Sequence, residues 1–181
     1  VFARIFNADG APVTDEFQVN EHAFHDQLEV DLTTRPDGSF LAVWTSSREM
    51  EFSEGAFGTN SYLAVKRYGS DGTVLMDEMV AQDHETIGAI SLQIEPGNAA
   101  IAALTQGRFA LAWQQARLHP DENRIGPPYP RRIRARVFEN DGRPVGDVIE
   151  VSQQSNAETN TEINARVAAL PGGGFAVAWD S

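Results

Sequence analysis

The chain contains no cysteine, which excludes a disulfide framework, a thiolate metal site and a cysteine nucleophile. Basic residues are also few, with 14 Lys and Arg against 26 Asp and Glu and a formal net charge of −12. Because nucleic acid is held by a net basic face, this balance argues against nucleic acid as the main partner. No apolar run approaches the about 18–20 residues that cross a bilayer, so no membrane span is predicted.

The residues that are present are typical of a folded protein. Hydrophobic residues make up 41% of the 181 positions and charged residues 22%, which is ordinary for a chain with a sizeable core. The length predicts either a single domain over residues 1–181 or a fragment of a longer repeat array.

Two sequence features recur in three copies. The first is a strand-like run that ends in an aromatic residue, followed by two further residues and then Asp-Gly. This pair supplies the positive φ of tight hairpin turns. Its copies cover residues 3–10, 65–72 and 135–142. The second is a Gly-containing turn followed by Phe-x-x-x-Trp. Its copies cover residues 38–44, 107–113 and 173–179, and they contain all 3 tryptophans of the chain.

Two shorter runs complete each copy. One precedes the Phe-x-x-x-Trp segment, at residues 30–32, 99–101 and 165–167, and the other follows the Asp-Gly turn, at residues 16–20, 78–80 and 148–152. Each repeat therefore carries four strand signals, and the repeats cover approximately residues 1–46, 62–115 and 133–181.

The Phe-x-x-x-Trp segments are apolar on both faces of the predicted strand. One face carries the larger residues: Phe40, Ala42 and Trp44; Phe109, Leu111 and Trp113; Phe175, Val177 and Trp179. The other face carries smaller ones: Leu41 and Val43; Ala110 and Ala112; Ala176 and Ala178. A strand with two apolar faces must be covered on both sides. We therefore expect stacked sheets in which the larger side chains of one sheet meet the smaller ones of its neighbour.

The pattern predicts an all-β fold of three four-stranded repeats that resemble β-propeller blades. A β-trefoil, which also contains three copies of four strands, is the alternative. Because propellers close with about four to eight blades, three blades require further blades, association of copies, or the trefoil.

At this point the motifs resemble a known repeat. Aromatic-x-x-Asp-Gly, then Glu-Phe-Gln-Val-Asn, then Leu-x-x-Gly-Gly-Phe-x-Val-x-Trp-x-Ser is similar to modules of very large secreted bacterial proteins that often also carry haemolysin-type calcium-binding (RTX-like) repeats. Residues 4–20 and 165–181 match best, and the middle repeat departs most. The resemblance implies an extracellular or cell-surface location and propeller-like repeats, and it brings no catalytic residues.

Two sets of residues are candidates for metal binding. Asp9, Asp71 and Asp141 are weak candidate ligands of calcium, because a calcium loop needs several oxygen ligands at alternating positions. The alternative is a plain hairpin turn. His22 and His25 have the residue types of a zinc site, and their alternative is a solvated loop. No cofactor is required by the sequence, and of these two metals it favours calcium.

One dense basic patch is the candidate ligand site. Arg131, Arg132 and Arg134, with Tyr129 from the adjoining proline-rich insertion, could bind an anionic polysaccharide. The alternative is a solvated outer strand whose arginines pair with acidic neighbours.

The chain shows no Gly-x-Ser-x-Gly elbow, phosphate-binding glycine loop or His-Glu-x-x-His motif. We therefore expect a non-enzymatic, secreted or cell-surface repeat module that serves assembly, adhesion or matrix binding, with other protein chains or further repeats as partners. A carbohydrate-binding lectin-like domain and a carbohydrate-active enzyme on a propeller scaffold are the alternatives.

Overall fold

The computed structural model describes residues 1–53, 56–83, 85–87, 92–94, 96–116, 131–152 and 162–181. Over these residues the protein is all-β, as predicted, and every strand pairing is antiparallel. A single 3-10 turn, η1 at Thr105–Gly107, is the one helical element of this part of the chain.

Two four-stranded sheets form the middle of the molecule. The first, in the order β3-β4-β5-β6, comprises Gln27–Thr34, Phe40–Ser53, Ala56–Tyr68 and Val74–Gln82. The second, in the order β9-β10-β11-β12, comprises Pro96–Ala103, Phe109–Ala116, Arg131–Phe138 and Pro144–Glu150. Each sheet is a meander, so every strand pairs with its neighbour in the chain.

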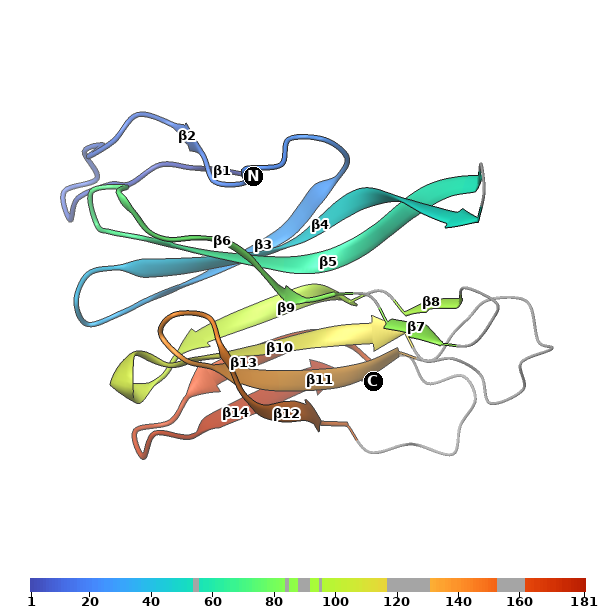
Figure 1. Ribbon diagram of the computed structural model, residues 1–181. Coiled ribbons are helices and arrows are strands. Elements are labelled where there is room, and N and C mark those ends of the chain that lie inside the picture. The colour runs from blue at the N-terminus through green and yellow to red at the C-terminus, as the bar shows by residue number, and fades with distance from the viewer. Residues whose placement is uncertain (54–55, 84, 88–91, 95, 117–130, 153–161) are drawn as a thin grey trace.

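Two two-stranded sheets lie at the ends of a stack (Figure 1). Strands β1 (Phe2–Ala3) and β2 (Phe17–Gln18) cover the first four-stranded sheet, and β13 (Ile163–Ala169) and β14 (Phe175–Asp180) lie against the second. A small hairpin of β7 (Glu85–Ile87) and β8 (Leu92–Ile94) adjoins the middle of the stack. The two chain termini are therefore at opposite ends of the stack.

The predicted glycine turns close the hairpins with repeated hydrogen bonds. In the three Asp-Gly turns the glycine amide donates to the residue three positions earlier, Gly10 to Asn7, Gly72 to Gly69 and Gly142 to Glu139, each at 3.0 Å. Gly10, Gly72 and Gly142 have φ values of 79°, 85° and 85°. Glycine reaches this left-handed region without the steric cost that other residues meet there, which explains why the turns end on it.

The core between the two four-stranded sheets joins faces of different size. Leu41 and Val43 of β4, with Leu63 and Val65 of β5, meet the larger side chains of the second sheet: Phe109, Leu111, Trp113 and Phe138. The same rule holds one layer further, where Ala112 of β10 packs with Phe175 and Val177 of β14. The predicted contact of larger with smaller faces is thus present at both junctions.

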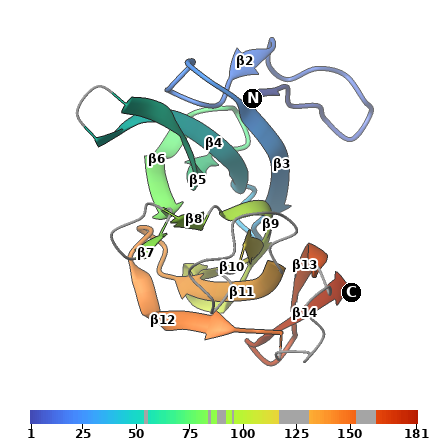
Figure 2. The same cartoon turned by 90° about the vertical axis from the view of Figure 1, so that its right-hand side faces the viewer.

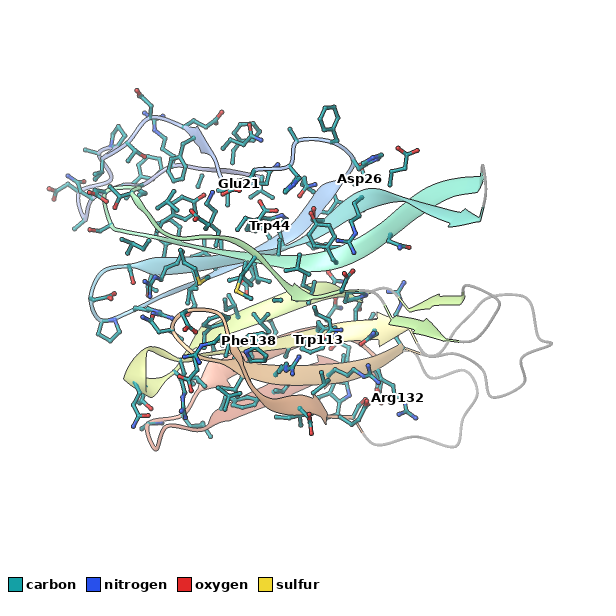
Figure 3. All side chains as sticks on the ribbon, in the orientation of Figure 1. Glu21, Asp26, Trp44, Trp113, Arg132 and Phe138 are labelled. Atoms are coloured by element: carbon teal, nitrogen blue, oxygen red, sulfur yellow. The ribbon has the colours of Figure 1, made fainter. Side chains whose placement is uncertain are left out.

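The larger face of the first sheet is covered by the N-terminal segment. Trp44, Ala42 and Tyr68 form one cluster with Val19 of the segment that follows β2, and Phe17, Ala3 and Val1 pack against that cluster. Figure 3 shows Trp44 and Trp113 in successive layers of the stack. Both indole side chains are completely buried, so two of the three tryptophans lie between layers, as predicted.

Polar contacts also join the two four-stranded sheets. Asp31 Oδ2 accepts from the Ile101 amide at 3.0 Å, and Thr33 Oγ1 accepts from the Ala103 amide at 3.2 Å. At the turn end of the sheets, Arg35 is buried and donates to Gly107 O at 2.7 Å and to Asn140 Oδ1. Burial, and then repulsion from Arg67, lowers the pKa of Arg35. These contacts fix the two sheets relative to one another.

One connection differs from the prediction. The sequence predicts a connection between the first two repeats over residues 46–60, whereas β4 continues to Ser53 and β5 begins at Ala56. Their pairing runs from Phe40↔Tyr68 to Ser53↔Ala56. A paired ribbon satisfies its own backbone hydrogen bonds, so these strands can extend beyond the sheet core without the apolar pattern that the sequence interpretation relied on.

Candidate interaction surface

A groove opens between the N-terminal segment and the first four-stranded sheet. Ile5, Phe6 and Val13 form one wall, and Leu32 of β3 and Phe40 of β4 form the other. Arg4 and Thr34 add polar groups at its margin. We name this feature the β1–β3 groove. A concave, mainly apolar surface of this kind suits another apolar chain segment or ligand.

The β3 wall of the groove is exposed where its counterpart in the second sheet is buried. Leu32 lies six residues before the turn glycine Gly38, and Ile101 lies six residues before Gly107. Leu32 is 58% exposed, whereas Ile101 is 4% exposed because the first sheet covers it. Leu28 and Val30 are exposed along the same strand. The apolar residues that line the groove therefore form a candidate site of interaction.

Strands β1 and β14 each have an unpaired edge within the described residues. Strand β1 pairs only with β2, and β14 pairs only with β13. Phe2 beside the β1 edge is 65% exposed and Phe6 is 55% exposed, while Trp179 on β14 is 38% exposed. Unpaired edges carry backbone donors and acceptors that can bind another strand, so both ends of the stack can accept one.

A network of polar contacts holds the segment after β2 on the first sheet. Lys66 Nζ donates to Glu21 Oε1 at 2.7 Å, the Glu21 amide donates to Glu78 Oε2 at 2.7 Å, and Asn20 Oδ1 accepts from the Val1 amino group at 2.7 Å. The hydrogen bond from Lys66 lowers the pKa of the Glu21 carboxyl. Burial alone would lower the pKa of Lys66. The hydrogen bond to Glu21 and the charges of Tyr68 and Glu21 outweigh this effect, so the pKa of Lys66 is raised. The network positions the β1 edge beside the groove.

The candidate calcium residues lie in separate turns. Asp71 Oδ1 accepts from the Thr73 amide at 3.0 Å and from Thr73 Oγ1 at 2.7 Å. Asp141 accepts from the Arg143 amide at 3.1 Å and from Arg143 Nε at 2.7 Å. These bonds lower the pKa of both carboxyls. The Asp9 amide donates to Asn7 Oδ1 at 3.1 Å. The contacts favour the hairpin-turn interpretation, and calcium binding stays a prediction.

The histidine candidates are not part of a metal cluster in the described part of the chain, where no group of three or more His, Asp or Glu side chains could hold a metal. His22 Nδ1 lies 3.3 Å from Glu78 Oε1, and its side chain is mostly exposed. His25 is exposed as well. The solvated-loop alternative fits this placement.

The arginine candidates lie along β11 beside acidic and amide groups. Arg134 Nη2 lies 2.7 Å from Glu150 Oε1, Arg132 Nη1 lies 3.6 Å from Glu150 Oε2, and Arg134 Nη1 donates to Gln115 Oε1 at 2.9 Å. Arg132 is labelled in Figure 3. Arg131 is exposed at the start of β11, and Tyr129 lies outside the described residues. The pairing with Glu150 favours the outer-strand alternative, and polysaccharide binding stays a prediction.

One structural feature was missed from the sequence. Glu29, Asn98 and Asn164 have positive φ values of 58°, 46° and 56°, each nine residues before a turn glycine. In every case the strand register shifts at this point, which marks a β-bulge. The two asparagines in apolar strands were the available signal, because asparagine tolerates this conformation.

No helix in the described residues has the length and apolar character that a membrane crossing needs. Comparisons with protein-family models, curated proteins and solved structures give no match to this chain. The resemblance to modules of secreted bacterial proteins therefore stays a prediction.

Proposed function

We propose that the chain is a non-enzymatic assembly module, built as a sector of a β-propeller, whose open half-sheets pair with strands of further repeats or of other chains. The secreted or cell-surface location that the resemblance implies belongs to this proposal. The observation that carries it is the exposure of large apolar side chains beside two unpaired strand edges, Phe2 and Phe6 at one end of the stack and Trp179 at the other.

The arrangement of the sheets supports the propeller interpretation over the trefoil. Meander sheets stack face to face, and their first strands β3, β9 and β13 lie toward the same side, with β6 and β12 on the opposite side (Figure 2). Strand β9 contacts both β3 and β13. Propeller blades are four-stranded sheets whose first strands surround a common axis, and this order fits them.

The β13–β14 hairpin indicates what kind of segment the β1–β3 groove would bind. Phe175 and Val177 of this hairpin pack against the face of the second sheet that carries the smaller residues. An equivalent hairpin beside β1 would cover Leu32 and extend the β1–β2 sheet to four strands. Strand addition of this kind combines backbone hydrogen bonds with side-chain pockets.

A binding experiment tests the proposal. A labelled peptide of residues 163–181 is titrated into dilute chain and followed by fluorescence anisotropy. We expect saturable binding, at least tenfold weaker for Leu32→Glu, which places a charge in the groove. Val74→Glu is the matched control, because Val74 is similarly exposed on β6, away from the groove, and it should bind like the parent. Absence of binding, or equal loss in both variants, contradicts the proposal.

A further inference from the structure

The two complete inner strand pairs share one register. Phe40 lies opposite Tyr68 and Trp44 opposite Ala64 in the first sheet, and Phe109 lies opposite Phe138 and Trp113 opposite Arg134 in the second. The first aromatic of Phe-x-x-x-Trp thus pairs with the aromatic before the Asp-Gly turn. The rings stack in both sheets, with centroids 5.4 Å apart for Phe40 and Tyr68 and 5.1 Å for Phe109 and Phe138.

Applied to the ends of the stack, this register joins β14 to the β1 strand. Phe175 would lie opposite Phe6, Val177 opposite Arg4, and Trp179 opposite Phe2. Three of the six paired residues are large exposed side chains, with exposed fractions of 65% for Phe2, 55% for Phe6 and 38% for Trp179. Strand pairing at this register would cover all three.

Residues 3–6, which begin with the last residue of β1, match residues of β11, the strand that already pairs with a Phe-x-x-x-Trp segment. Residues 3–6 read Ala-Arg-Ile-Phe, and residues 135–138 read Ala-Arg-Val-Phe. The two arginines make the same contact, because Arg4 Nε donates to Thr14 O at 3.2 Å and Arg136 Nε to Gly146 O at 3.1 Å, each ten residues on. Residues 2–6 therefore carry the side chains that complete a sheet with β14.

The packing faces agree with the same pairing. Val1 and Ala3 already contact the larger face of the first sheet, and Ala176 and Ala178 of a joined β14 would extend that small-residue face over Leu32 and Phe40. On the opposite face, Phe175 and Val177 of β14 already pack on Ala112 and Ala135 of the second sheet. The joined sheet would continue the packing seen at the two described junctions.

We propose that a second copy of this chain is the partner, and that two copies close a ring in which β14 of each pairs with β1 of the other. The inference rests on the proposed assembly function and names its partner. Apart from the β7–β8 hairpin, the described residues of each copy form two four-stranded sheets and two two-stranded half-sheets. Two copies therefore give six four-stranded sheets, and closed propellers have about four to eight. Three copies would exceed that range. Closed symmetric dimers are also the commonest soluble oligomers.

Engineered cysteines test the register directly, because the parent chain contains none. Arg4→Cys and Val177→Cys chains are mixed and oxidised, and disulfide-linked dimer is measured on a non-reducing gel. Residues directly opposite one another meet the distance that a disulfide requires. The matched control pairs Phe2→Cys with Val177→Cys, which lies two positions out of register on the same face. We expect at least tenfold more cross-linking for the first pair.

The double variant Arg4→Cys/Val177→Cys tests closure of the ring. A closed dimer gives a cross-linked dimer as the end product, whereas an open array gives a ladder of larger species and overturns the closed ring. Light scattering on the parent chain should give twice the mass of one chain, reduced to a single chain by Leu32→Glu and unchanged by Val74→Glu.

The outcomes separate this inference from the proposed function. A chain that stays monomeric without register-specific cross-links, but binds the 163–181 peptide, overturns the second copy as partner and leaves strand addition standing; the occupant is then a further repeat or another protein. A chain that neither cross-links nor binds the peptide contradicts both. Equal cross-linking of the two cysteine pairs also overturns the proposed register.

Discussion

The middle and the ends of the stack are built from the same strand motif in different surroundings. In the middle, Trp44 and Trp113 are fully buried because their sheets have a neighbouring layer and a paired strand on either side. At the end, Trp179 lies on a strand with one open edge and stays partly exposed. This motif therefore becomes a core element only where a further strand and a further layer complete its surroundings.

The largest expected difference between the two regions concerns the tryptophans. Trp113→Ala should lower the free energy of unfolding by about 3–5 kcal/mol, because it leaves a cavity between two sheets. Trp179→Ala, in dilute monomeric chain, should cost only about 1–2 kcal/mol, since less apolar area is removed from a protein environment. Urea unfolding followed by circular dichroism measures both. Equal losses would show that the ends are packed as tightly as the middle.

A smaller difference is expected for two arginines. Arg35 is buried between the four-stranded sheets, whereas Arg4 donates to a carbonyl oxygen at the exposed N-terminal end. Arg35→Ala should destabilise the chain by about 1.5–3 kcal/mol, because it removes the charge-assisted hydrogen bonds of a buried side chain. Arg4→Ala should change stability by less than about 0.5 kcal/mol. Thermal unfolding of both variants measures the two losses of stability. A larger loss for Arg4→Ala than for Arg35→Ala would contradict this expectation.

The smallest expected effect is a pH dependence of the turns. Hydrogen bonds to Thr73 lower the pKa of Asp71, so the native state favours the ionised form. The resulting stabilisation is present above the ordinary Asp pKa of about 4 and is lost as the pH falls through the lower folded value. Asp71→Asn retains an acceptor without titrating, so its unfolding midpoint should fall less steeply on acidification than that of the parent. Parallel curves for the two proteins would argue against this role.

The strands and turns could be predicted because their signals are local. The Phe-x-x-x-Trp segments indicate strands with two apolar faces. Gly10, Gly72 and Gly142 indicate turns with positive φ, which the structure contains. These local requirements do not depend on what lies across the sheet, so the all-β class and the contact of larger with smaller faces followed from them.

The remaining features depend on contacts distant in the sequence. The Glu150 partner of Arg132 and Arg134 lies across a strand pair, so the sequence left open whether the basic run binds a ligand or pairs with acidic neighbours. Ile5 and Val13 line the β1–β3 groove together with Leu32 and Phe40, and no sequence motif predicts that these residues lie together. Leu32 has the sequence character of a core residue, and only the structure reveals that it is exposed.

Amide hydrogen exchange of the chain, compared at low and high protein concentration, tests most directly whether the two ends are complementary halves of one sheet. We expect residues of β4 and β10 to be protected at both concentrations. Residues 2–6 and 175–180 should gain protection together as the concentration rises, and Leu32→Glu should abolish that gain. Protection of these two segments that is independent of concentration, or that changes in only one of them, would contradict the account.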